Sequence, residues 1–295
     1  MSHLVLGPVL FNWPPEKWRD FYFRIADEAD LDTVCVGEVV CSKRLPFFAD
    51  YIPEVIERLQ SANKKIIMPT LALIMNKREM ESVRSITALD EPDILVEAND
   101  ISATSLLKGR PHTVGPFVNV YNEGTLDYLA RNGAQSICLP IELGLSSISA
   151  LAPNSPTELE VFAFGRMPLA ISARCYHARA HGLHKDSCQF VCDKDPDGMN
   201  VDTLEHQPFL AVNGVQTMSH GFVDLTSSLD DLQEIGVQRF RLSPHDNVDM
   251  VQVAATYRAV SEGLMDPIEA HSLIKMSMPD ITFCSGYMGD GIACH

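Results

Sequence analysis

Residues 4–38 read LVLGPVLFNWPPEKWRDFYFRIADEADLDTVCVGE and contain one complete strand–helix–strand unit. The apolar run Leu4–Leu10 predicts a strand, and the two prolines shortly after it prevent the strand from continuing. Residues 16–30 carry tryptophan, phenylalanine and isoleucine among charged residues, which is typical of an amphipathic helix. A second apolar run, Asp32–Glu38, then predicts the next strand. The unit is therefore a β-α-β repeat whose strands are parallel.

The same alternation continues along most of the chain. Together with the two strands above, the predicted strands are Lys65–Leu73, Ile94–Ala98, Thr113–Val120, Ser136–Glu142, Glu158–Gly165 and Arg239–Leu242. Eight strands alternating with helices in 295 residues favour an α/β fold of the (β/α)8 TIM-barrel type. The alternative is a doubly wound open sheet, which is weakened because no Gly-x-Gly-x-x-Gly or Gly-x4-Gly-Lys turn follows the first strand.

Two segments interrupt the alternation. Residues 166–238, between the seventh and eighth strands, form a long insertion that we predict to be irregular and that holds three of the eight cysteines. Long excursions of this kind in a compact domain are usually functional or disordered. Residues 266–295 follow the last barrel helix and predict a helix-then-loop tail. We therefore expect a barrel-like domain over 1–265, including the insertion, and a C-terminal tail.

The charge of the chain restricts its partners. It has 23 Lys+Arg and 39 Asp+Glu, so its net charge is 23 − 39 = −16. Such a surface repels polyanions and disfavours nucleic acid or an anionic membrane as the main partner. The longest apolar stretch, Ile66 to Met75, is too short to span a bilayer, and the N-terminus lacks the features of a signal peptide. We expect a cytoplasmic protein, where thiols stay reduced.

Three cysteines of the insertion follow the pattern Cys175-x12-Cys188-x3-Cys192. The flanking residues are basic, and positive charge both lowers thiol pKa values and offsets the negative charge of a thiolate-bound metal centre. The pattern predicts a site for a soft metal rather than three unrelated core thiols. Zinc ligands come more often as Cys-x2-Cys pairs, so the wider gaps favour iron–sulfur, while zinc with a nearby histidine stays open.

A four-thiolate site needs one more ligand. Cys35 and Cys138 lie inside predicted strands and are expected to be small core residues. Cys41 follows the carboxyl end of the second strand, on the face of a barrel that it would share with the segment after strand seven. We therefore favour Cys41, with Cys284 and Cys294 of the tail as further possibilities.

Polar side chains at strand ends are the other candidates for chemistry, because these ends form the active-site face of a barrel. They are Glu38, Glu97 with Asn99, Asn119 with Asn122, and Glu142. Several carboxylates around one mouth could act as acids and bases or bind a polar substrate, but helix caps and loop hydrogen bonds explain each one equally well. His177 and His181 are i,i+4 neighbours without a His-Glu-x-x-His motif.

At these residues the sequence resembles the U32 peptidase-like family, and within it the ubiquinone-biosynthesis members. The stretches that carry the resemblance run from the first strand to the last: residues 6–10 with Trp13-Pro14, 37–44, 70–73, 168–175 with 185–188, 213–218 and 241–244. They cover almost the whole chain apart from the tail.

The resemblance implies a [4Fe–4S] cluster on Cys41, Cys175, Cys188 and Cys192. It also implies a heterodimer with a UbiU-like paralogue, a UbiT-like lipid carrier, and oxygen-independent hydroxylation of a ubiquinone precursor ring, with prephenate as the hydroxyl donor. No nucleophile or zinc motif supports a peptidase. The alternatives are a U32-type peptidase or RNA-hydroxylation relative, and a non-catalytic iron–sulfur scaffold or redox relay.

Overall fold

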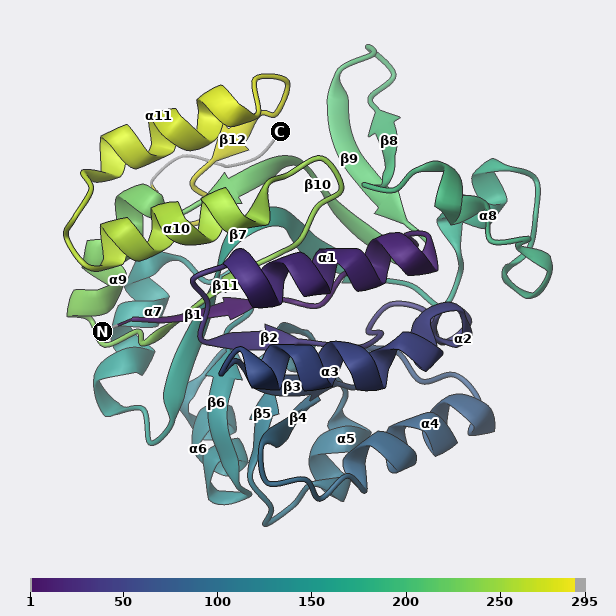
Figure 1. The fold of residues 1–295 in the computed structure, drawn as a ribbon, viewed down its shortest axis with the longest axis horizontal. Coiled ribbons are helices and arrows are strands. Elements are labelled where there is room, and N and C mark those ends of the chain that lie inside the picture. Colours follow the sequence, from purple (N-terminus) through teal and green to yellow (C-terminus); the bar gives the residue numbers. More distant parts are fainter. Residues whose placement is uncertain (1, 290–295) are drawn as a thin grey trace.

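The computed structural model describes residues 2–289 and shows a closed barrel of eight parallel strands (Figure 1). The barrel strands are β1 (His3–Leu6), β2 (Thr33–Cys35), β3 (Lys65–Pro69), β4 (Ile94–Ala98), β5 (His112–Val114), β6 (Ala134–Cys138), β7 (Glu158–Ile171) and β11 (Arg239–Leu242). Strand β11 pairs in parallel with both β7 and β1, which closes the ring. The predicted (β/α)8 fold is therefore confirmed, and the open doubly wound sheet is wrong.

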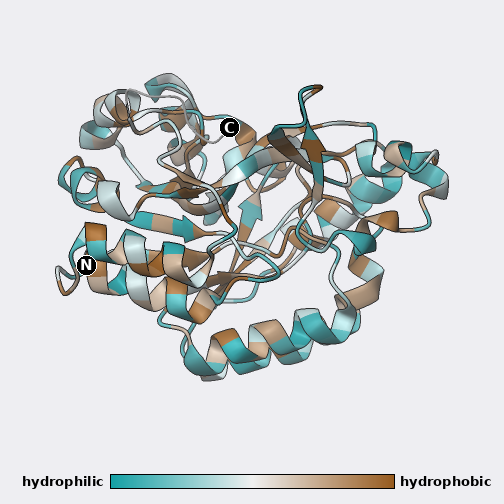
Figure 2. Cartoon of the chain, turned by 90° about the horizontal axis from the view of Figure 1, so that it is seen from above, coloured by the Kyte–Doolittle hydropathy of each residue, from teal (hydrophilic) through white to brown (hydrophobic). Residues whose placement is uncertain are grey.

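Helices surround the barrel. They are α1 (Pro15–Glu28), α2 (Leu45–Phe48), α3 (Ile52–Ser61), α4 (Lys77–Thr87), α5 (Ile101–Leu106), α6 (Glu123–Arg131), α7 (Leu145–Leu151), α9 (Leu229–Glu234) and α10 (Met250–Ser261). The first of them begins at Pro15, where a missing N–H costs nothing, and buries Trp18, Tyr22 and Ile25 against the strands. Figure 2 shows hydrophobic colour along the central strands and alternating colour on the outer helices.

The segment between β7 and β11 is more regular than predicted. Strand β7 does not stop at Gly165 but continues to Ile171, and β10 (Gln216–Asp224) returns antiparallel beside it. Strands β9 (Pro208–Asn213) and β8 (Met199–Asp202) extend this sheet beyond the barrel. Only the part around the short helix α8 (Tyr176–Ala180) matches the irregular excursion that the sequence predicts.

The predicted strand ends at Gly165, because glycine often interrupts strands. In the structure this glycine allows the backbone to pass close to a neighbouring side chain. Its φ is +114°, and a Cβ at this position would lie 2.7 Å from Nε2 of His245. The barrel part of β7 thus bends into the outer sheet at a residue without a side chain. The bend carries the chain from the barrel wall into the cysteine-bearing segment.

The C-terminal segment also differs from the predicted helix-then-loop. Helix α11 (Pro267–Ser277) is followed by a two-residue strand, β12 (Phe283–Cys284), which pairs in parallel with β10. Asp224 of β10 holds this part in place, because its carboxylate lies 2.7 Å from Nδ1 of His271 and 2.8 Å from the Tyr257 hydroxyl. Cys294, a possible ligand in the sequence analysis, lies outside the described residues. Across residues 2–289, none of the helices combines the length and apolar character that a membrane crossing requires.

Burial of His3 predicts a loss of stability in mild acid. Burial, followed by the charge of Arg239, lowers the pKa of His3 from 6.5 to about 4. As the pH falls from 6.5 towards 4, the unfolded chain binds a proton that the folded chain does not, so the free energy of unfolding decreases in this window. His3→Gln should flatten that pH dependence in urea unfolding experiments, whereas His184→Gln, at an exposed histidine, should leave it unchanged.

Candidate functional site

Four cysteines from two distant parts of the chain line one cavity. Cys41 lies beyond the carboxyl end of β2, and Cys175, Cys188 and Cys192 come from the segment after β7, as the barrel topology predicts. All four are partly buried. The other residues lining this cavity, which we call the cysteine cavity, are Lys43, Arg44, His177, Lys185, Phe190, Val191 and Gly214.

The two cysteines assigned to the core are placed there. Cys35 and Cys138 are fully buried inside β2 and β6 and do not line the cysteine cavity. Burial raises the pKa of both thiols well above the ordinary range, although the charge of Arg241 opposes this. They are therefore neutral packing residues rather than metal ligands.

Glu38 shapes the loop that carries Cys41. Its carboxylate accepts hydrogen bonds from the backbone N–H groups of Val40 at 2.7 Å and Cys41 at 2.9 Å. Burial raises the pKa of this carboxyl group, while Arg44 and the N–H donors favour its charged form. The N–H of Lys43 in turn donates to the Cys41 sulfur. Glu38, a candidate for acid–base chemistry from the sequence, is thus positioned to fix the Cys41 loop.

Arg44 is a buried cation at the wall of the cysteine cavity. Its side chain is 1% exposed, and its terminal nitrogens donate to the carbonyl of Leu10 and to Oδ1 of Asn213, both at 2.7 Å. Its Nε has no hydrogen-bond partner, and within residues 2–289 no carboxylate forms an ion pair with it. Gly214 makes room for this guanidinium, because a Cβ there would lie 2.8 Å from Nη2.

Cysteine side chains and Glu38 surround the charge of Arg44. Burial opposes its positive charge, but Cys192, Glu38 and Cys41 raise the pKa of Arg44, and Arg44 also hydrogen-bonds the Cys192 side chain. A buried cation without an ion-pair partner is costly, so the cavity suits a negatively charged group. Sequence reasoning missed Arg44, although its position three residues after Cys41 was a usable signal.

Burial favours the neutral form of two of the four cavity thiols. Burial raises the pKa of Cys41 and Cys175. The Cys175 sulfur accepts the N–H of Ala178 at 3.4 Å, which favours its charged form but does not overcome burial. A bound metal centre would supply the positive charge that thiolates at these positions need.

A second group of metal-ligand atoms lies beside the cavity. His177, His181 and Asp195 offer one atom each, all within 4.8 Å of one another, so they could hold a metal ion. His177 is fully buried, its Nε2 lies 2.8 Å from Asp195, and its Nδ1 has no partner. In the described part of the chain no three cysteine sulfurs lie as close together as these atoms. Asp195, three residues after Cys192, was missed by the sequence analysis.

The acidic residues after Cys192 also attach the insertion to the barrel. Asp197 accepts from Nδ1 of His245 at 2.5 Å and pairs with Arg166 at 3.4 Å. Burial opposes ionisation of this carboxyl group, but His245 and Arg166 lower its pKa. The indole N–H of Trp13 donates to the Pro196 carbonyl at 2.8 Å. The segment after Cys192 is therefore held against the mouth of the barrel.

The remaining strand-end candidates are not part of the cysteine cavity. Glu97 pairs with Arg241 inside the barrel, and Asn99 donates to Glu97 at 2.9 Å. Asn119 has a left-handed φ of 61° at the end of the 3-10 helix Pro116–Val118, and Asn122 caps α6 through the N–H of Thr125. Exposed Glu142 lies 3.5 Å from the Tyr121 hydroxyl. Of these residues only Asn122 caps an α-helix, whereas Glu97 and Asn99 belong to a buried network inside the barrel.

Comparison with known proteins gives a family and a distant structural likeness. A dihydropteroate synthase (FolP) from Thermus thermophilus has a similar solved structure, with a TM-score of 0.42 and 12% sequence identity. The match covers 89% of this chain and 92% of that one. The model of peptidase family U32 matches residues 17–283. That range contains all eight barrel strands except β1 and all four cysteines of the cavity, so the chain belongs to peptidase family U32.

Proposed function

We propose that this chain is a UbiV-like iron–sulfur subunit of an oxygen-independent hydroxylase that acts on the ring of a ubiquinone precursor. The observation that carries the proposal is the cysteine cavity itself, where four thiols and the buried, unpaired guanidinium of Arg44 meet. The resemblance of the cysteine-bearing stretches to the ubiquinone-biosynthesis members of the family supports the choice of reaction.

The spacing of the sulfurs supports a cluster over a single zinc ion. Zinc–sulfur bonds of about 2.3 Å place the sulfurs of a tetrahedral zinc site roughly 3.8 Å apart. No three cysteine sulfurs within residues 2–289 lie within 4.8 Å of one another, although all four residues line the same cavity. A [4Fe–4S] cluster separates its four thiolates more widely, and its negative charge would neutralise Arg44.

Residues of this chain would hold that group and position its ligands. Cys41, Cys175, Cys188 and Cys192 would hold it, and a cluster so held would supply one-electron chemistry. Glu38 fixes the Cys41 loop, and the N–H groups of Lys43 and Ala178 donate to ligand sulfurs. Phe190 and Val191 line the cavity with apolar surface and limit access of water.

The proposal includes partners. A UbiU-like paralogue would form a heterodimer with this chain, and a UbiT-like carrier would deliver the quinone precursor. The net charge of −16 supports delivery by a protein, because an acidic surface is repelled by anionic lipid. The chain purified alone would then lack full activity.

The reaction is tested by lipid analysis of a deletion strain. Because the oxygen atom would not come from O2, the strain should make normal ubiquinone in air and accumulate an unhydroxylated polyprenyl precursor without oxygen. Cys175→Ala in the chromosomal gene should reproduce this defect, and Cys138→Ala should not. Mass spectrometry of extracted quinones measures both.

Other outcomes favour the alternatives. Normal anaerobic ubiquinone in the deletion strain would contradict the hydroxylase. Loss of an RNA hydroxylation or of peptidase activity in that strain would instead assign the chain to those branches of the family. If the partner hydroxylates normally in the presence of cluster-free Cys175→Ala protein, this chain is a non-catalytic scaffold.

A further inference from the structure

Two histidines and one aspartate of the insertion meet beside the short helix α8. His177 lies within α8 and His181 follows its last residue, so the two are four residues apart and share one helix face. Their rings stack, with centroids 5.8 Å apart and an angle of 15° between the planes. Asp195 follows the 3-10 helix Val191–Lys194. One ligand atom from each of the three residues lies within 4.8 Å of the other two.

A hydrogen bond between His177 and Asp195 does not by itself explain this arrangement. Nε2 of His177 lies 2.8 Å from Asp195, but Nδ1 of this fully buried ring has no partner, and an unpaired buried polar atom is costly. Within residues 2–289 the His181 ring makes no hydrogen bond, so both of its nitrogens are free to bind a ligand. The three side chains therefore keep binding capacity that the hydrogen bond does not use.

The separations of these atoms are close to those around a bound metal ion. Bonds of about 2.0–2.2 Å from zinc to histidine nitrogen or carboxylate oxygen place tetrahedral ligand atoms roughly 3.3–3.6 Å apart. The 2.8 Å between His177 and Asp195 is shorter than this, and the 4.8 Å that encloses all three atoms is longer. Small side-chain rotations would therefore bring the three atoms to ligating distances.

This group of three residues is accessible and distinct from the four thiols. His177 lines the cysteine cavity, but His181 and Asp195 do not. His181 is exposed and the Asp195 side chain is 32% exposed, so an ion can enter from solvent without passing the cysteines. Because His177 belongs to both places, an ion bound here would lie beside the cysteine cavity.

We propose that His177, His181 and Asp195 bind one divalent transition-metal ion, Zn²⁺ or Fe²⁺, in addition to the group held by the four cysteines. Imidazole nitrogens suit these ions, whereas Mg²⁺ prefers a shell of oxygen atoms. Three protein ligands leave a coordination position open, so the bound ion would polarise an oxygen atom of water or of a substrate. None of the three ligands is a cysteine, so the site does not depend on the proposed function.

Metal binding to protein without an affinity tag tests the site. The protein is prepared anaerobically with iron and sulfide, dialysed against Zn²⁺, Fe²⁺ or Mg²⁺, and analysed for metals. It should bind one Zn²⁺ or Fe²⁺ beyond the metal held by thiolates, and the tighter-bound ion identifies the metal; Mg²⁺ should not bind there. His181→Gln and Asp195→Asn should each raise the Kd of this ion about tenfold or more, because even the loss of a group that only supports a ligand costs about 10–100-fold.

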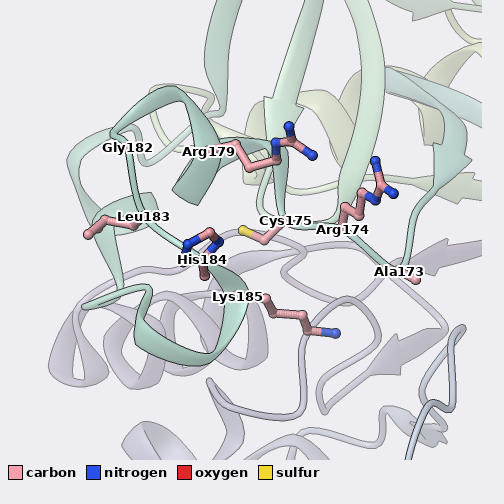
Figure 3. Close-up of a pocket in the computed structure, with 8 residues that line it drawn as sticks. All are labelled: Ala173, Arg174, Cys175, Arg179, Gly182, Leu183, His184 and Lys185. Atoms are coloured by element: carbon pink, nitrogen blue, oxygen red, sulfur yellow. The ribbon is translucent and has the colours of Figure 1, made fainter.

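His184→Gln and Asp193→Asn are the matched controls. Both residues are exposed and belong to the same segment, but neither is part of the group of three. His184 lies in the loop after α8, where it lines a pocket together with Cys175 (Figure 3). Both control variants should bind the ion as the unmodified protein does.

X-ray absorption at the zinc edge identifies the ligand atoms, which should be nitrogen and oxygen. Three results would overturn the inference: no additional ion, equal Kd values in the variants and their controls, or sulfur ligands on the zinc that His181→Gln loses. If the protein assembles no iron–sulfur cluster, the difference between His181→Gln and His184→Gln still tests this site. Failure of the proposed function and failure of the metal site are therefore distinguishable.

Discussion

Replacing any one of Cys41, Cys175, Cys188 or Cys192 by alanine is expected to remove most of the iron from anaerobically prepared protein. The four residues line one cavity, each would supply one of four thiolates, and within residues 2–289 no other cysteine lines that cavity. Changes to groups that merely support metal ligands typically cost about 10–100-fold in affinity, so loss of a ligand should cost about tenfold or more. Iron and sulfide analysis and visible absorption measure the effect.

Cys35→Ala and Cys138→Ala are the controls for this series. Both thiols are fully buried in barrel strands, and a change from cysteine to alanine preserves most of their packing, so iron content should stay normal. Stoichiometric zinc without iron in the unmodified protein would contradict the cluster. Equal iron loss in the two controls would show that the first four variants act through folding rather than ligation.

The barrel could be predicted because its signals are local. Most strands are short apolar runs between turn residues, and α1 begins at a proline pair with apolar residues spaced to face the strands. The signal is weaker in the outer strands. Strand β8 is at the edge and only partly buried, and the apolar run 209–212 of β9 follows exposed Pro208. Their pairing depends on β7 continuing past Gly165, which only tertiary contacts determine.

The four cysteines could likewise be assigned to one site from their spacing and the barrel topology. The side chains around them could not be predicted. Arg44 binds Leu10 and Asn213, which lie 34 and 169 residues away in the sequence. His177 meets Asp195, which lies 18 residues later in the sequence, so no helical spacing relates the two. Contacts of this kind depend on the folded arrangement of loops, and no sequence pattern with a fixed spacing describes them.

The barrel interior contains a buried ion network that should be costly to break. Glu160 of β7 accepts hydrogen bonds from Arg241 and, at 3.1 Å, from Arg239, and Arg241 also pairs with Glu97 of β4. Glu97, Glu160 and Arg241 are at most 4% exposed. Burial opposes ionisation of Glu160, but the two arginines outweigh it and lower the pKa of this carboxyl group. Glu160 therefore stays charged at neutral pH, and each member of the network depends on the others.

Glu160→Gln should accordingly lower the free energy of unfolding by about 3–5 kcal/mol, because it leaves buried guanidinium charge uncompensated. Glu158→Gln is the matched control. Its carboxylate is 55% exposed and pairs with the same Arg239 at 3.2 Å, so its loss should cost roughly 1 kcal/mol or less. Urea unfolding followed by circular dichroism measures both free energies of unfolding. The comparison is valid when the slope of the free energy of unfolding against urea concentration is the same in both variants. Equal destabilisation by the two variants would contradict the conclusion that burial of an ion pair determines the cost of losing it.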